Sequence, residues 1–121
     1  MIFYSDAGDP MLLDSAVGLR DLHAQITGFV DSVAVNETLL ASPLGNPEPY
    51  AEFLRGLRVS KIDGAPALSI SPDRWLEFSS PALELRRFAE KLLMLNGEHR
   101  HWYCTPVSLI IEADDWRASN G

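Results

Sequence analysis

The sequence predicts an α+β fold, a two-layer sandwich in which a single antiparallel sheet of about five to six strands carries two main helices on one face. Two stretches, roughly 15–31 and 81–95, place apolar residues at helical spacing. Residues 57–79 and 99–114 alternate apolar and polar side chains, as strands with one solvated face do. Short turns separate these strands, which favours antiparallel pairing between neighbours.

Length and composition indicate one globular domain over residues 1–121. The chain has 121 residues, 46% of them hydrophobic and 22% charged, which suits a packed core rather than a disordered chain. Residues 116–121 are expected to be a frayed C-terminal tail. The apolar runs are short, the start lacks a basic leader, and a single cysteine cannot form an internal disulfide. We therefore expect a cytoplasmic protein without a membrane span.

The first half of the chain begins with two short strands, 2–4 and 11–14, and a helix that Asp14 or Ser15 caps. One stripe of this helix is expected to face the core: Leu19, Leu22, Ile26 and Phe29. Residues 34–47 have no clean period and contain two prolines, and a long connection of this kind is often functional or mobile. A short helix is expected to open at Pro49.

The second helix has the strongest signals, because Ser80 can cap it, Pro81 suits its first position, and Asn96-Gly97 ends it. Its buried stripe is expected to be Leu85, Phe88, Ala89 and Leu92. The stretches "MLLDSAVGLRDLHAQI" and "RWLEFSSPALELRRFAEKL" both read as an apolar strand, a serine and then a helix. This similarity suggests an internal repeat.

Two histidines in "GEHRHWYC" raise the question of a metal site. Side chains two apart on a strand share a face, and a two-residue loop at Thr105-Pro106 would place His99 opposite Glu112 and His101 opposite Ile110. His99, His101 and Glu112 form a ligand set typical of non-haem iron or catalytic zinc. Such an open strand face lacks the walls of a pocket, so we interpret it as a polar strand face and expect no metal or cofactor.

Other catalytic chemistry is scarce in the sequence. It contains no glycine-rich phosphate loop, no nucleophile elbow and no zinc-protease motif. Cys104 falls on the apolar side of its predicted strand, which favours a small core residue over a nucleophile. These observations predict a protein that is not an enzyme.

Charge is concentrated in one half of the chain. Residues 1–54 hold eight acidic residues and one basic residue, whereas residues 55–121 hold nine of each, so the first segment carries the whole net charge of −7. Such a field attracts basic surfaces and repels nucleic acid and membranes, although acidic faces also serve solubility alone. The predicted partner-binding residues are Asp14, Asp21, Asp31, Glu37 and Glu48.

The segments "WLEFSSPALELRRFAEKLLML", "EHRHWYC" and "SLIIEADD" resemble the immunity protein 32 family of bacterial polymorphic toxin systems, over residues 67–115. The resemblance implies a non-catalytic protein that binds and blocks a cognate toxin, and the acidic charge suits a toxin with a basic surface. Two alternatives stay open. One is a small metal-dependent enzyme at His99, His101 and Glu112, and the other is a homodimeric structural or regulatory domain. The protein is expected to be a monomer or a homodimer.

Overall fold

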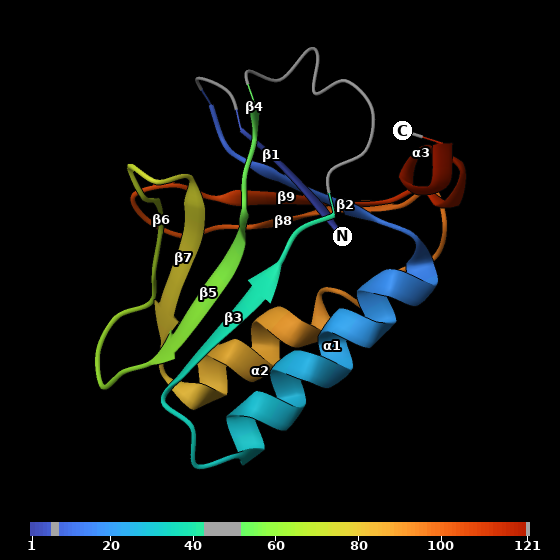
Figure 1. The fold of residues 1–121 in the computed structure, drawn as a ribbon. Coiled ribbons are helices and arrows are strands. Elements are labelled where there is room, and N and C mark those ends of the chain that lie inside the picture. The colour runs from blue at the N-terminus through green and yellow to red at the C-terminus, as the bar shows by residue number, and fades with distance from the viewer. Residues whose placement is uncertain (6–7, 43–51, 121) are drawn as a thin grey trace.

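The computed structural model describes residues 1–5, 8–42 and 52–120, which form two mixed sheets, two long helices and a short third helix (Figure 1). The first sheet has the strand order β4-β1-β2-β9-β8 and the second has the order β3-β5-β7-β6. In chain order the elements are β1 (Ile2–Ser5), β2 (Met11–Asp14), α1 (Ala16–Asp31), β3 (Asn36–Leu40), β4 (Glu52–Phe53), β5 (Gly56–Lys61), β6 (Ala67–Ile70), β7 (Trp75–Ser80), α2 (Ala82–Glu90), β8 (His99–Trp102), β9 (Leu109–Ala113) and α3 (Asp115–Asn120).

The prediction of a single antiparallel sheet is wrong. Strand β2 runs parallel to β9, and β5 runs parallel to β7. Strands β5 and β6 follow each other in the chain but do not pair, because β7 lies between them. The length of a turn indicates only whether two consecutive strands can pair. A parallel pair is joined by a longer crossover, which turn lengths do not predict. The two sheets therefore arise from pairings between strands far apart in the chain, which the local sequence pattern does not predict.

The two halves of the chain contribute the same order of elements. Each supplies a hairpin, a helix and a further antiparallel strand pair: β1–β2, α1 and β3–β5 in the first half, and β6–β7, α2 and β8–β9 in the second. The last strand of each half then joins the hairpin of the other half, so both sheets contain strands of both halves. Positions 66 apart are equivalent and are buried in both halves: Leu19 and Leu85, Leu22 and Phe88, and Ile26 and Leu92, the last of which lies just after the end of α2.

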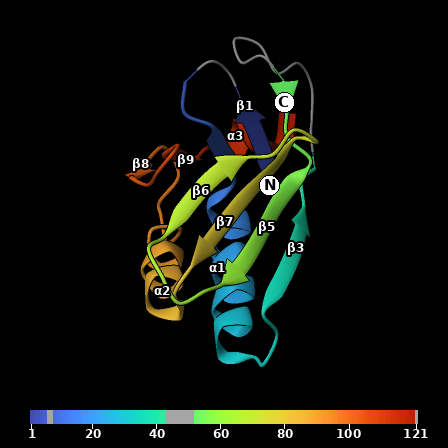
Figure 2. The same cartoon turned by 90° about the vertical axis from the view of Figure 1, so that its left-hand side faces the viewer.

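One core lies where the two long helices meet the inner faces of both sheets. Figure 2 shows the four-stranded sheet lying over α1 and α2, with β3 at its border. The predicted apolar stripes of both helices are buried there, as expected. Phe88 of α2 packs edge to face against Phe78, with ring centroids 5.1 Å apart. A second, smaller apolar cluster occupies the other face of the five-stranded sheet.

The ends of the helices differ in part from the prediction. Ser15 caps α1 as expected, and its Oγ accepts a hydrogen bond from the Gly18 amide at 3.0 Å. Pro81 rather than Ser80 is the cap residue of α2, without a side-chain cap bond. Ser80 is fully buried and donates to the Pro81 carbonyl at 3.1 Å. The serine before Pro81 is thus a core residue, because its side chain points into the molecule from β7.

Two further local predictions are wrong. Residues 116–120 were expected to be a frayed tail but belong to α3, whose Asp115 accepts a hydrogen bond from the Ala16 amide at 2.9 Å. Glu52 and Phe53, expected in a helix, form β4 because they pair with β1. The start of that expected helix, Pro49, lies outside the described residues. No helix among the residues described is long and apolar enough to cross a membrane.

Candidate functional site

The histidine strand has the predicted register but does not assemble a metal site. His99 lies opposite Glu112 and His101 opposite Ile110, as predicted, although residues 103–108 connect the strands in place of the expected two-residue loop. The rings of His99 and His101 are 5.9 Å apart, and His101 stacks on Tyr103 at 5.7 Å. The Glu112 carboxylate accepts a hydrogen bond from Arg117 at 2.8 Å. Within the described ranges, no three histidine, cysteine or acidic side chains are placed to hold a metal ion.

The predicted partner-binding acids separate into different places. Asp31 forms an ion pair with Arg86 of α2, which places it on the side where the two helices meet. The Asp14 carboxylate accepts from the Ser15 amide at 2.7 Å and lies 3.1 Å from the Met1 amino group. Glu48 lies outside the described residues. Asp14, Asp21 and Glu37 line the same side of the molecule, where Asp14 is already paired with the Met1 amino group.

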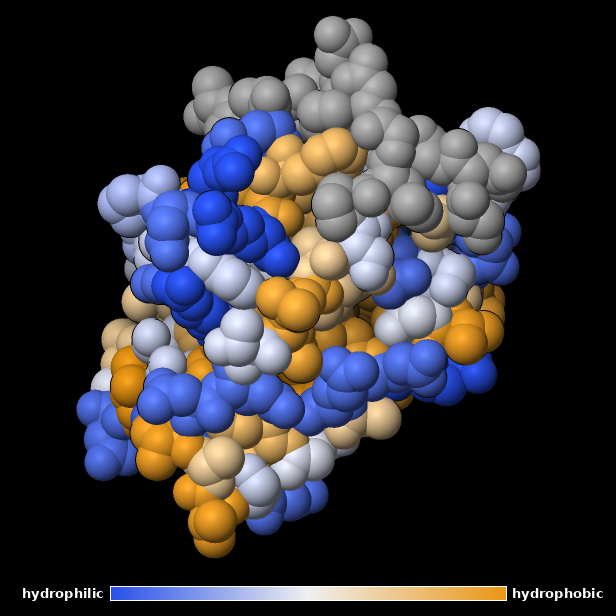
Figure 3. Space-filling view, viewed as in Figure 1, coloured by the Kyte–Doolittle hydropathy of each residue, from blue (hydrophilic) through white to orange (hydrophobic). Residues whose placement is uncertain are grey.

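A groove runs between α1 and β3, and we call it the α1–β3 groove. Its wall on α1 is formed by Gly18, Asp21, Gln25 and Gly28, and its wall on β3 by Glu37 and Leu39. It consists of two adjoining hollows of about 460 and 310 Å³, both of which Gln25 lines. The face that carries β3 and α1 shows apolar side chains bordered by polar ones (Figure 3).

The groove is acidic. Asp21 is exposed on α1, and Glu37 points from β3 toward α1, on the same side of the strand as Leu39. Glu37 Oε2 is buried and accepts no hydrogen bond from a described residue. None of the described residues that line the two hollows is a lysine or arginine. Lys61 borders the second hollow, because its Nζ donates to the Ser32 carbonyl at 2.7 Å and lies 4.5 Å from the centre of the Phe29 ring, and both residues line that hollow. A buried carboxylate oxygen without a donor is costly, so a cation in the groove would be stabilised.

The groove is bordered by the outer edge of β3, which is the last strand of its sheet and is open as far as the described part of the chain is concerned. The Ala41 amide donates to Arg55 at 2.9 Å, and the Lys61 amide donates to Val35 at 2.9 Å. Odd-numbered residues of this segment therefore turn their backbone groups toward β5. It follows that the amides and carbonyls of Asn36, Thr38 and Leu40 point away from the sheet, and such an edge is a template for another strand.

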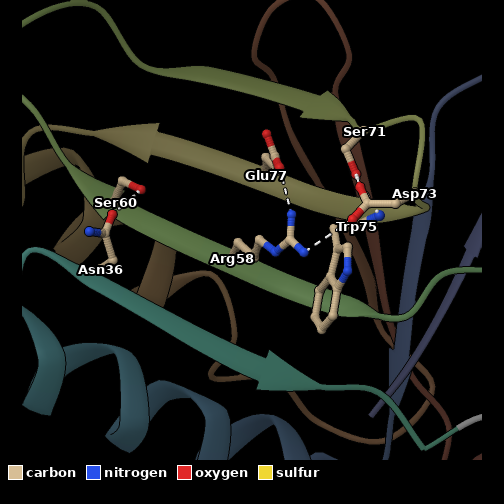
Figure 4. Close-up of polar contacts among 7 residues, drawn as sticks. All are labelled: Asn36, Arg58, Ser60, Ser71, Asp73, Trp75 and Glu77. Atoms are coloured by element: carbon tan, nitrogen blue, oxygen red, sulfur yellow. Dashed lines mark hydrogen bonds and ion pairs between the residues drawn. The ribbon is translucent and has the colours of Figure 1, made fainter.

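The outer face of the four-stranded sheet also carries charges, but they satisfy one another (Figure 4). Arg58 lies 3.1 Å from Glu77 and 3.2 Å from Asp73, and its guanidinium sits 4.4 Å from the centre of the Trp75 ring. The hydrogen bond from Ser71 and those of Arg58 lower the pKa of Asp73, against a smaller rise from burial. Because these partners lie within the protein, this face offers less to a ligand than the groove does.

The second half of the chain has an equivalent groove, here called the α2–β8 groove, with a volume of about 490 Å³. Its lining residues are Glu84, Arg87, Glu90, Lys91, Arg100 and Trp102. Arg87 and Lys91 lie 66 positions after Asp21 and Gln25. Two basic residues thus occupy the places of an acid and an amide in the α1–β3 groove.

The sequence predicts the acidic residues of this site but not the strand that carries one of them. The concentration of acids indicated Asp21 and Glu37, but β3 was hidden in residues 34–47, where prolines and the lack of a clean period predicted a connection. The signal that could have found it is the alternation in "NETLL", in which Glu37 and Leu39 share one face. Gly18, Gln25 and Gly28 carry no signal of their own.

Comparisons with known proteins give no relative for this arrangement. No protein-family model matches the chain, and neither a curated protein nor a solved structure is significantly similar to it.

Proposed function

We propose that this chain is a non-enzymatic binding protein of the immunity type, which neutralises a partner protein by binding a basic surface in the α1–β3 groove. One observation carries the proposal: Asp21, a Glu37 carboxylate oxygen without a donor and the outer edge of β3 line one groove. No lysine or arginine is among its described lining residues, and the Met1 amino group at one end is paired with Asp14. The toxin as the partner is the expectation from the family resemblance over residues 67–115.

Electrostatics support a basic partner. The net charge of −7 arises in residues 1–54, and that segment supplies both walls of the groove. A surface of one sign attracts a partner of the opposite sign, raises the association rate and makes that rate dependent on salt. The neutral second half, residues 55–121, cannot supply such a field.

The arrangement of the histidine strand supports a role without catalysis. His101 stacks on Tyr103, and Glu112 is engaged by Arg117. A catalytic centre needs a nucleophile or base, a group that orients it and a pocket for the substrate. On this strand the rings contact each other on an exposed face.

The proposal is tested by titrating the protein with decalysine and, as a control, decaglutamate at low salt, and following the backbone amides by NMR. We expect decalysine to shift amides of α1 and β3, and the double variant Asp21→Asn/Glu37→Gln to weaken its binding about tenfold. The matched control is Glu84→Gln/Glu90→Gln in the α2–β8 groove, for which binding should change less than about twofold.

Equal losses in the two double variants, or shifts spread evenly over the surface, would contradict the proposal. The immunity role has its own test, coexpression with the C-terminal domain of a secreted protein encoded next to this chain. Growth restored by the chain but not by Asp21→Asn/Glu37→Gln would support that role. Growth that stays arrested would contradict it.

A further inference from the structure

We infer that the partner occupies the α1–β3 groove with an extended basic segment, which adds to the open edge of β3 as a fifth strand of the four-stranded sheet. The inference rests on the proposed function, because it assumes that this groove is where a basic partner binds. It goes further by naming the conformation of the bound segment and the pattern of its side chains.

The backbone of β3 provides the first part of the recognition. The amides and carbonyls of Asn36, Thr38 and Leu40 point to the open edge, since the ladder to β5 uses the odd-numbered residues between them. A new strand would lie about 4.8 Å from β3 and pair with these groups. Strand addition of this kind takes affinity from the main chain and specificity from alternate side chains.

The wall of α1 provides the second part. A Cβ added at Gly28 would meet nothing within 4 Å, so the helix leaves open space beside β3 at that position. The side chains of an added strand alternate between the two faces of the sheet. Those that turn toward α1 would lie beside Asp21 and the Glu37 side chain, whose Oε2 has no donor among the described residues. Lysine or arginine at every second position satisfies both carboxylates.

The other face of the added strand sets a second requirement. Asn36 and Thr38 lie on the outer face of the sheet, where Asn36 accepts a hydrogen bond from Ser60 at 2.8 Å. Small polar residues suit this face, because cross-strand neighbours there are hydroxyls and amides. The expected segment therefore alternates basic residues with threonine or serine.

A second copy of this chain is the other candidate for the edge, through its own edge strand β8. Two of the three cations that line the α2–β8 groove are already engaged, because Arg87 contacts Glu84 at 2.6 Å and Arg100 donates to the Lys91 carbonyl at 3.3 Å. Two copies that each carry a charge of −7 also repel each other. These observations favour a foreign basic segment.

The test uses the intact protein and two labelled peptides of the same composition. One alternates threonine and lysine, and the other groups its lysines in one block. At low salt we expect the alternating peptide to bind about tenfold more tightly by fluorescence anisotropy. In hydrogen exchange it should slow the amides of Asn36, Thr38 and Leu40 about tenfold or more.

One variant removes a single outward donor. Thr38→Pro deletes the amide that points to the open edge and keeps the ladder to β5, and proline is tolerated on edge strands. We expect this variant to bind the alternating peptide about fivefold more weakly. If it does not fold, the exchange rates of the three amides in the unmodified protein decide the question.

The outcomes separate the two proposals. If both peptides bind equally and only Asp21→Asn/Glu37→Gln weakens them, the groove binds cations and strand addition is wrong. If the peptide instead protects the amides of His99 and His101, the edge of β8 is the site and the inference is overturned. It is also overturned if β3 is protected without peptide while light scattering shows a dimer. Absence of binding and protection contradicts both proposals.

Discussion

The α1–β3 and α2–β8 grooves occupy the same place in the two halves of the molecule but have opposite charge. Each lies between a long helix and the edge strand that follows it in the chain. Glu37 and Arg100 hold equivalent positions. Their partners Val59 and Ile111 pair in turn with Phe78 and Leu12, which are 66 positions apart. The equivalents of Asp21 and Gln25 are basic. The same arrangement of helix and strand therefore carries surfaces of different charge in the two halves.

The two grooves also differ in how far their charged side chains are paired: Glu84, Arg87 and Arg100 of the α2–β8 groove have partners. In the α2–β8 groove, the Arg100 guanidinium donates to the Lys91 carbonyl and Arg87 pairs with Glu84. In the α1–β3 groove, Glu37 Oε2 is buried and has no donor among the described residues. Buried polar groups are normally hydrogen-bonded, and an exception calls for an explanation. A bound cation is the explanation that the acidic groove suggests.

The largest expected effect is a loss of stability at core positions that the two halves share. Leu22 and Phe88 are equivalent and both are at most 2% exposed. Leu22→Ala should lower the free energy of unfolding by about 2–5 kcal/mol, and Phe88→Ala by about 3–5 kcal/mol, because each leaves a cavity. Urea unfolding measures both. The control is Leu83→Ala, at a position 60% exposed on α2, which should change stability by less than about 0.5 kcal/mol. A small effect at either buried position would mean that the halves do not share one core.

The sequence predicted the parts of the fold that depend on local pattern. The buried stripes of α1 and α2 follow from helical spacing, and the antiparallel β8–β9 pair has the predicted register although residues 103–108 form a longer connection than expected. In these elements a local period or the pairing of consecutive strands fixes the geometry. The separation into two sheets depends on the parallel pairs β2–β9 and β5–β7, which join segments from different halves of the chain. No local period encodes such a pairing.

The candidate site was predictable only in its charge. The concentration of acidic residues predicted Asp21 and Glu37 as partner-binding residues. It predicted Asp31 as well, but Asp31 pairs with Arg86 across the two helices. The packing of α1 against α2 is what places Asp31 outside the groove, and the sequence does not predict this packing. The open edge of β3 could not be foreseen, because it depends on which strand is last in a sheet whose order the sequence did not reveal.

An intermediate effect tests how α1 forms its wall of the groove. A Cβ at Gly18 would clash with the Asp14 carboxylate, whereas one at Gly28 would meet open space. Gly18→Ala should therefore displace Asp14 from the Ser15 amide and destabilise the protein by about 1 kcal/mol. Gly28→Ala should stabilise it by about 0.5–1 kcal/mol, because alanine is the better helix former. Urea unfolding of the two variants side by side measures the difference. Equal changes of the same sign would contradict the packing of Asp14 over Gly18.

The smallest effect concerns Asp73, a carboxylate that has its partners, in contrast to Glu37. Its pKa in the folded protein lies below the ordinary value of 3.8, mainly because Ser71 donates to it. The ionised form therefore stabilises the fold; this contribution is present above the ordinary pKa and is lost as the pH falls through the folded-state pKa. Asp73→Asn should be slightly less stable than the unmodified protein at neutral pH and equally stable at strongly acidic pH. Ser71→Ala should retain only part of the pH-dependent difference. Urea unfolding midpoints measured from pH 7 downward test this. If the difference in midpoint between the unmodified protein and Asp73→Asn stays constant down to acidic pH, the partners of Asp73 do not stabilise its ionised form.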